Sequence, residues 1–228
     1  MIEDGSLARG SPAGHPPAAE DRPLVVIVDD SDTIRTALEE LFLSVDIETL
    51  SFENARTLLE STLPDRPGCF ILDVRMPGLS GLDLQSELAE IGHLMPIVFL
   101  TGHGDVPMSI RAIKAGAFDF KTKPVRDQDL LDAVSAAIDA DRARRAVYKV
   151  AQDSAMRFNT LSPRERQVLE CIVGGLLNKQ IAYELGVMEV TIKLHRGNVM
   201  RKMDVGSVAE LVRIWDQIPV PVRQGDVA

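Results

Sequence analysis

The chain has 228 residues, of which 45% are apolar and 26% are charged, and its formal net charge is −9. This composition is typical of a soluble globular protein, and the length suits two small domains better than one. Uninterrupted apolar runs stay well below the roughly 18 residues of a transmembrane helix, and the N-terminus lacks the apolar segment of a secretory signal. Two distant cysteines make no disulfide framework, so we expect a cytoplasmic protein without a membrane contact.

The charge is distributed unevenly along the chain. Residues 22–141 carry 10 basic and 21 acidic side chains, whereas residues 142–215 carry 13 basic and 7 acidic ones. An acidic module is therefore followed by a basic one, and a basic excess in a small domain is typical of proteins that bind polyanions. A solvated surface with uneven charge would have the same composition, so charge alone leaves both interpretations open.

Composition and periodicity divide the chain into five parts. Residues 1–22 are rich in Gly, Pro, Ala and Ser without periodicity, which predicts a disordered tail. A first module follows at 23–140, a charged helical linker at 141–158 and a second module at 159–218, and a short tail completes the chain at 219–228. Apolar residues in the linker are spaced too irregularly to predict a coiled coil.

The first module alternates short apolar runs with amphipathic segments. The runs predict strands at 24–30, 47–52, 69–74, 96–102 and 117–120, and the segments predict helices at 32–44, 53–62, 83–91, 106–115 and 128–145. This alternation predicts an α/β fold of the flavodoxin type, with a five-stranded parallel, doubly wound sheet. In such sheets the functional site lies beyond the carboxyl ends of the strands.

Polar residues close the predicted strands of this module. Asp29 and Asp30 end the first strand, Asp73 ends the third, Thr101 ends the fourth, and Lys123 follows the fifth. Three carboxylates at one edge repel each other unless a cation joins them, and oxygen ligands favour Mg²⁺. Together with a lysine and a hydroxyl they predict a phosphoryl-acceptor site in which Asp73 is the nucleophile. Acids at a strand end can also cap the next helix, but capping does not explain the other three positions.

The second module predicts four helices, at 162–173, 178–185, 189–203 and 207–217, and no strand. The second and third read as a helix-turn-helix with Gly186 at the turn. Cations, amides and hydroxyls on the outer face of the third helix suit the major groove of DNA; they are Thr191, Lys193, His195, Arg196, Asn198, Arg201 and Lys202. A small helical bundle with a charged solvent face remains the alternative.

The segments VVIVDDSDTIR, ILDVRMPGLSGLDL, PIVFLTGHGDVPMSIRAIKAGAFDF and KTKPV resemble the receiver domain of two-component response regulators. The resemblance covers the whole first module. It implies that Asp73 accepts a phosphoryl group from a sensor histidine kinase, and that Thr101 and Lys123 contact the phosphoryl oxygens. It also implies that Mg²⁺ is bound by Asp29, Asp30, Asp73 and the backbone carbonyl of Arg75, and that Phe120 is the switch aromatic.

The segment LSPRERQVLECIVGGLLNKQIAYELGVMEVTIKLHRGNVMRKM resembles the LuxR-type helix-turn-helix domain of response regulators of the FixJ/NarL class. The resemblance implies a DNA-binding surface made of Asn178, Lys179, Thr191, Lys193, Leu194, His195, Arg196, Arg201 and Lys202. Within that surface Lys193 and Leu194 face bases, while Lys179, Thr191 and Arg201 hold phosphates. Val208, Leu211 and Val212 on the last helix are expected to form a dimer contact.

These observations predict a response regulator transcription factor that is not an enzyme. Phosphorylation is expected to promote a homodimer and its binding to promoter DNA, with activation of transcription as the outcome. Two alternatives stay open, a module that docks a protein partner and a regulator that binds DNA independently of phosphorylation. An aspartate-based phosphatase is disfavoured because Arg75 stands where such an enzyme needs a general acid.

Overall fold

The computed structural model describes residues 22–102 and 106–224, and the structural statements below refer to those residues. The chain divides into two compact units between Arg142 and Ala143. This boundary falls within helix α5, Asp127–Asn159, a single helix where two overlapping helical segments were expected. None of the described helices combines the length and the hydropathy that crossing a membrane requires.

The first unit is built on a five-stranded sheet in the order β2-β1-β3-β4-β5, in which every neighbouring pair is parallel. This arrangement confirms the predicted doubly wound fold. Each strand lies within two residues of its expected bounds, the usual uncertainty at element ends. The strands are β1 Leu24–Val28, β2 Glu48–Phe52, β3 Gly68–Leu72, β4 Ile97–Thr101 and β5 Asp119–Thr122.

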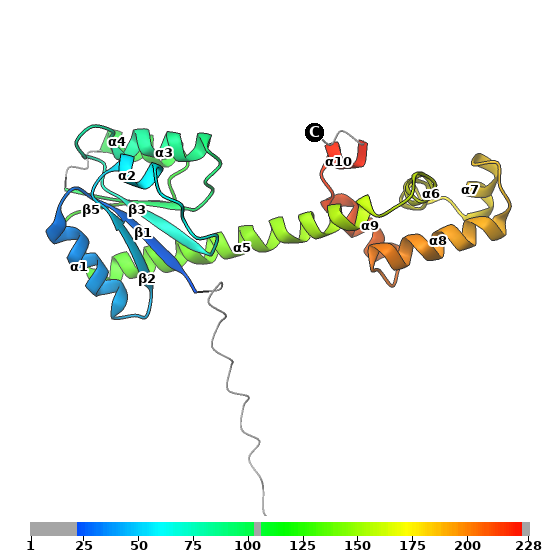
Figure 1. Cartoon of the computed structure of the whole chain (residues 1–228), viewed down its shortest axis with the longest axis horizontal. Coiled ribbons are helices and arrows are strands. Elements are labelled where there is room, and N and C mark those ends of the chain that lie inside the picture. The colour runs from blue at the N-terminus through cyan, green and yellow to red at the C-terminus, as the bar shows by residue number, and fades with distance from the viewer. Residues whose placement is uncertain (1–21, 103–105, 225–228) are drawn as a thin grey trace, which may run out of the picture. The chain divides into compact units, whose positions relative to one another are not determined.

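Helices cover both faces of this sheet (Figure 1). Side chains of α1 and α5 pack with Val25 and Ile27 of β1, whereas α2, α3 and α4 pack with Leu24, Val26 and Val28 on the opposite face. A central strand with both faces covered is apolar throughout, which is why β1 reads as one continuous apolar run. The remaining helices of the unit are α1 Asp32–Leu43, α2 Ala55–Leu59, α3 Gly81–Glu90 and α4 Val106–Lys114.

The second unit is entirely helical in its described part and confirms the predicted fold class. Its helices are α6 Pro163–Val173, α7 Asn178–Glu184, α8 Glu189–Met203, α9 Val208–Gln217 and α10 Val220–Gln224. Helix α10 lies where only a tail was expected, and the Arg223 guanidinium stacks on the Trp215 ring 4.8 Å from its centroid. Leu211 is fully buried in the core of this unit, so the expected dimer contact is wrong for this residue.

Candidate functional site

Three carboxylates meet at the carboxyl edge of the sheet. Asp29 and Asp30 follow β1 directly and Asp73 follows β3. Because these strands are neighbours whose last residues, Val28 and Leu72, are paired in register, the chain leaves both strands side by side. Oxygen atoms of the three acids all lie within 4.8 Å of one another. The structure thus brings together the acids that the sequence placed at matching strand ends.

Two more strands contribute to the same cluster. Lys123, just beyond β5, places its Nζ 2.5 Å from Oδ2 of Asp29 and 3.9 Å from Oδ1 of Asp73. Thr101, the last residue of β4, is fully buried, and its hydroxyl donates a hydrogen bond to the Asp73 carboxylate. Four strand ends therefore supply one site, as the parallel topology requires.

Asp73 is a buried member of this cluster. Its side chain is only 10% exposed, and burial raises the pKa of its carboxyl above the ordinary value. The Lys123 ammonium and the Thr101 hydroxyl oppose this rise in pKa, while the negative charge of Asp29 adds to it. The amide of Val74 also donates to Oδ1 at 2.9 Å. The carboxylate is thus poorly solvated and incompletely neutralised by the protein.

The donor set fits a hard divalent cation. All three candidate ligands are aspartates, so the cluster offers only carboxylate oxygens. Mg²⁺ binds through one or two carboxylates together with waters and phosphate oxygens, so Asp29, Asp30 and Asp73 are sufficient protein ligands. The Lys123 ammonium reaches Asp29 and Asp73 only, which leaves the repulsion involving Asp30 for a cation to relieve.

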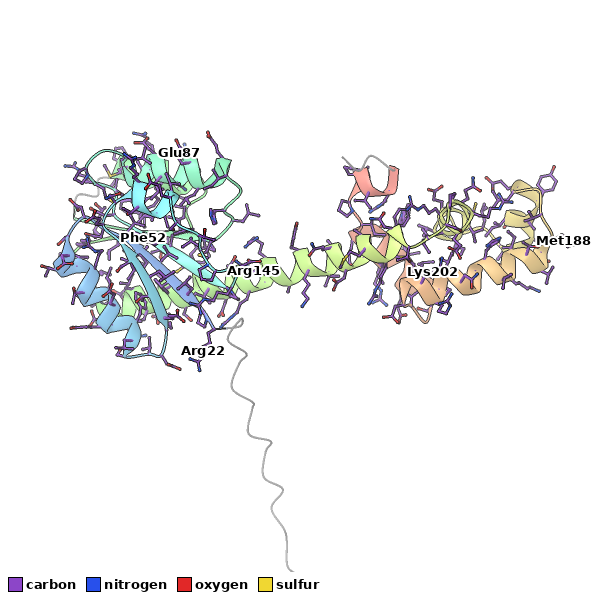
Figure 2. The ribbon with its side chains drawn as sticks, in the orientation of Figure 1. Arg22, Phe52, Glu87, Arg145, Met188 and Lys202 are labelled. Atoms are coloured by element: carbon purple, nitrogen blue, oxygen red, sulfur yellow. The ribbon has the colours of Figure 1, made fainter. Side chains whose placement is uncertain are left out.

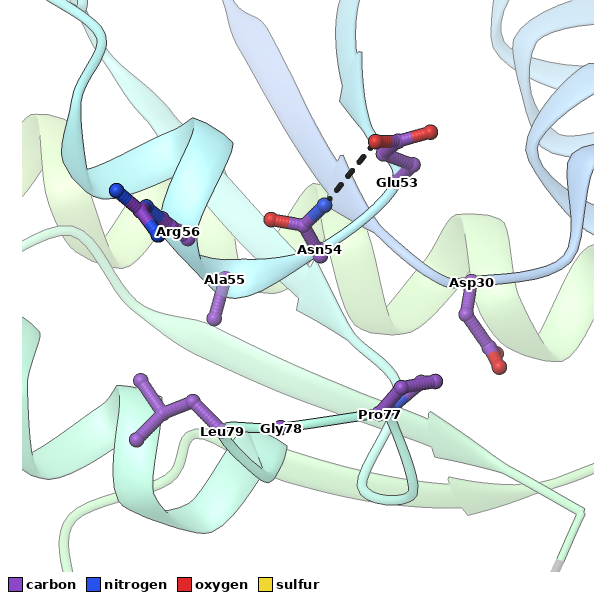
Figure 3. Close-up of a pocket in the computed structure, with 8 residues that line it drawn as sticks. All are labelled: Asp30, Glu53, Asn54, Ala55, Arg56, Pro77, Gly78 and Leu79. Carbon is purple, nitrogen blue, oxygen red and sulfur yellow. Dashed lines mark hydrogen bonds between the residues drawn. The ribbon is translucent and has the colours of Figure 1, made fainter.

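A cavity of about 590 Å³ opens beside Asp30, between the loops that follow β2 and β3 (Figure 3). Its polar walls are engaged locally, because Asn54 caps α2 through the amide of Thr57 and Arg56 pairs with Glu60 at 2.7 Å. The cavity therefore gives access to the carboxylates through Asp30. Sequence periodicity does not predict it, since it forms between loops.

Phe120 and Arg75 are the other two residues to which the receiver resemblance gave a role, and both are close in sequence to residues of the site. Phe120 is half-buried in β5, and its ring centroid lies 6.1 Å from that of Phe99. It packs against the same core cluster as Met108 of α4. The Arg75 side chain is exposed and follows Asp73 in the loop after β3. Phe120 therefore lies on the strand beside the one that ends in Thr101, and it packs against the same core as α4.

In the second unit, helix α8 presents the polar face that the sequence predicted. Ile192, Val199 and Met203 are fully buried, and Met200 is partly buried against the same core. The exposed side chains include Lys193, Leu194 and Arg201, while Thr191, His195 and Arg196 are half-buried. Lys179 of α7 is also exposed. A convex cationic surface of this kind suits the grooves and phosphates of a duplex.

Lys193 pairs with Glu189 of the same helix at 3.4 Å, and two further DNA-binding candidates form hydrogen bonds to other segments of the unit. Lys202, labelled in Figure 2, donates from Nζ to Oε2 of Glu165 at 2.6 Å and to the carbonyl oxygen of Thr160 at 3.0 Å. This bond lowers the pKa of Glu165, whose carboxylate completes the capping box of α6 with Ser162. Arg196 donates to Oδ1 of Asn178 at 3.1 Å and ties α8 to α7.

Comparison with known protein families matches both units. Residues 25–135 match the response regulator receiver domain, and residues 159–215 match the bacterial regulatory proteins of the luxR family. The chain is 48% identical to nodulation protein W of Bradyrhizobium diazoefficiens over 207 residues, which cover 91% of each chain. It is 42% identical to the transcriptional regulatory protein FixJ of Azorhizobium caulinodans over 190 residues, 83% of this chain and 90% of that one.

Among solved structures, that of the response regulator StyR superposes with a TM-score of 0.80 at 44% identity and covers 86% of this chain and 99% of its own. The fold and the acidic cluster define a receiver domain joined to a helix-turn-helix output domain. The chain belongs to the FixJ-type response regulators with a LuxR-type domain, a family of transcription factors that are not enzymes. Receiver domains bind Mg²⁺ at such an acidic pocket, and the family implies a sensor kinase and DNA as partners.

Proposed function

We propose that a sensor histidine kinase phosphorylates this chain on Asp73 and that this event switches its binding to promoter DNA. The observation that carries the proposal is the single cluster formed by Asp29, Asp30 and Asp73 together with Lys123 and Thr101. The protein is expected to act in the cytoplasm, where its kinase and its DNA are both accessible.

The chemistry follows from the placement of the side chains. An Asp73 oxygen attacks the phosphorus of a phosphohistidine, forming an O–P bond as the N–P bond breaks and the imidazole leaves. Mg²⁺, held by Asp29, Asp30, Asp73 and the Arg75 carbonyl, supplies charge neutralisation on the transferring group. Lys123 is close enough to both buried acids to move its hydrogen bond from a carboxylate to a phosphoryl oxygen. Catalysis of this kind is mostly positioning and electrostatics.

Phosphorylation is expected to redirect the Thr101 hydroxyl from the carboxylate toward the new phosphoryl oxygens. That movement vacates space that Phe120 fills, and it changes the face made by α4 and β5. This face already exposes apolar side chains, with Val106 71%, Ile110 48% and Ile113 48% exposed, which favours association of two copies. Reversing a 1:99 equilibrium takes about 5.5 kcal/mol, which a few charge-assisted hydrogen bonds at about 1.5–3 kcal/mol each can supply.

The LuxR-type unit is proposed to enter the major groove with α8. Lys193 and Leu194 are exposed in the N-terminal half of the helix and are the candidates for base contacts. The candidates for phosphate and supporting contacts are Asn178, Lys179, Thr191, His195, Arg196, Arg201 and Lys202. A homodimer would read an inverted repeat with half-sites about one helical turn apart, and binding would activate transcription.

A gel-shift titration on promoter fragments next to the gene of this protein tests the proposal. Wild-type protein and Asp73→Asn are compared with and without a small-molecule phosphodonor and Mg²⁺, at several salt concentrations. We expect salt-sensitive binding that the phosphodonor tightens for the wild type alone. Equal affinity of both proteins under all conditions would favour phosphorylation-independent binding, and no shift on any fragment would favour a protein-docking output.

A further inference from the structure

Helix α3 buries one polar side chain against helix α4. Gln85 is 5% exposed and lies among apolar neighbours of α3, Leu84 and Leu88, which are fully or almost fully buried. Its Nε2 donates to the carbonyl oxygen of Ala115 at 3.0 Å and to that of Ala112 at 3.4 Å. Both carbonyls lie at the C-terminal end of α4, where helix carbonyls lack partners within the helix.

The orientation of this side-chain amide is fixed by what it faces. Rotating it would place Oε1 against two carbonyl oxygens, so only the observed orientation gives hydrogen bonds. In this orientation Oε1 is buried and has no partner within the described part of the chain. A buried polar atom without a partner costs free energy that offsets what the two bonds contribute. The net contribution of Gln85 to stability is therefore small, and a role in placing α4 explains its presence better.

Helix α4 has few other attachments at this end. Ala112 is its one fully buried residue, and Met108 is partly buried against the same core. The chain after the helix is held by its own amides, since Gly116 donates to the carbonyl of Ile113 and Ala117 to that of Ala112, and it joins the sheet where the Phe118 amide donates to the Ile97 carbonyl of β4 at 2.8 Å. These bonds lead to the sheet, whereas the two bonds from Gln85 tie the C-terminal turn to α3.

We propose that Gln85 is a positioning residue that fixes the C-terminal end of α4 and thereby biases the receiver toward its resting arrangement. The part of this inference that concerns regulation rests on the proposed function, because α4 is the element expected to change after Thr101 and Phe120 move. To activate the receiver, phosphorylation must overcome the free-energy difference that favours the resting state over the active one. Loosening α4 reduces that difference and raises the fraction of active protein before phosphorylation.

Hydrogen exchange on the unphosphorylated full-length protein tests the structural part. In Gln85→Met, which keeps a side chain of similar length without donors, we expect the amides of residues 112–117 to exchange about three- to tenfold faster, the range expected for a lost hydrogen bond. Gln85→Leu also lacks the amide donor and should show a similar effect. The matched control is Ser86→Ala, the next residue of α3, whose hydroxyl donates to the Leu82 carbonyl within the same helix. Unchanged exchange in both Gln85 variants would overturn the proposal.

DNA affinity with and without a phosphodonor tests the regulatory part. We expect Gln85→Met to keep its melting temperature and its phosphorylated affinity, and to raise the affinity of the unphosphorylated protein severalfold. A lower melting temperature with an unchanged ratio of the two affinities would show a merely structural residue and would overturn the proposal. If wild-type affinity does not respond to the phosphodonor, the proposed function fails, and the exchange measurement still decides whether Gln85 fixes α4.

Discussion

The two units of the molecule carry their functional residues in opposite ways. In the receiver, residues from four strand ends touch one another, and Asp73 and Thr101 are 7% and 0% exposed. In the LuxR-type unit, the functional candidates lie mainly on one helix, and several of them point into solvent. A site whose parts contact each other can be recognised from the chain alone. A surface that contacts an external partner is recognised by exposed side chains that the packing of the protein itself does not require.

This difference also separates stability from function. Charges in the receiver cluster interact at low hydration, so changing one of them alters the energy of the others and of the fold. Charges on the outer face of α8 are screened by solvent and contribute little to the folded state. Substitutions in the receiver cluster should therefore change activity and stability together, and substitutions on the exposed face of α8 should change DNA affinity alone.

The largest expected effect is that of Lys123→Ala. Removing the ammonium that faces Asp29 and Asp73 should lower the rate of phosphoryl incorporation at least about 100-fold, because a preorganised charge that stabilises the transition state is lost. Intact-protein mass spectrometry with a small phosphodonor and Mg²⁺ measures this rate. The control is Lys121→Ala, whose ammonium pairs with Asp119 at 2.9 Å on the same strand. Wild-type incorporation in Lys123→Ala would mean that the cluster is not the reacting site.

Adjacent cations on α8 offer the next test, since Arg201 is exposed and Lys202 is bonded to Glu165. We expect Arg201→Ala to weaken DNA binding about three- to tenfold and to reduce the slope of log affinity against log salt by about 1, as the loss of one phosphate contact does. Lys202→Ala should instead lower the free energy of unfolding by about 1–3 kcal/mol, because the buried Glu165 carboxylate loses its charged partner and keeps the hydrogen bond from the amide of Ser162.

Salt-dependent gel shifts and urea unfolding on both variants separate these outcomes. A reduced salt slope with unchanged stability for Lys202→Ala would make Lys202 a DNA contact, as the family resemblance implies. The Glu165 pKa is lowered mainly by this hydrogen bond, so the stability that the bond contributes is present above the unfolded pKa of Glu and is lost as the pH falls through the lower folded value. The free energies of unfolding of the wild type and Lys202→Ala should therefore differ most near neutral pH.

The receiver site could be predicted from sequence because one physical rule positions it. Parallel strands end at the same edge, so the residue that follows each apolar run identifies a neighbour of the others. The order of Asp29, Asp73, Thr101 and Lys123 along the chain was therefore enough to expect their convergence. The fold class followed from the same alternation of strands and helices.

What could not be predicted depends on contacts between segments far apart in sequence. Helical periodicity indicates whether a position points outward, but it does not show that Lys202 meets Glu165 or that Gln85 meets the end of α4. Leu211 was expected at a dimer contact, and the structure places it in the core. The cavity beside Asp30 lies between loops, whose conformation has no periodic signal in the sequence.

The smallest effect is that of Asp73→Asn on stability in the absence of divalent ions. Because burial raises the Asp73 pKa, the folded receiver takes up a proton more readily than the unfolded chain does, so the charged carboxylate disfavours the folded state once the pH exceeds the unfolded pKa. We expect the variant to be more stable than the wild type at pH 7, and this advantage to vanish as the pH falls below the unfolded pKa of Asp, about 4. Urea unfolding followed by circular dichroism in a chelator measures it.

The other unit provides the control within the same molecule. The single tryptophan, Trp215, packs on Phe158 in the LuxR-type unit, so its fluorescence follows unfolding there. That transition should be identical in wild type and Asp73→Asn, while the receiver transition shifts. Adding Mg²⁺ should stabilise the wild-type receiver more than the variant, because the ion binds the folded state through the carboxylate that the variant lacks. Equal stabilisation of the two receivers would show that Asp73 is not a ligand of the ion, and a shift of the tryptophan transition would show that the two units do not unfold independently.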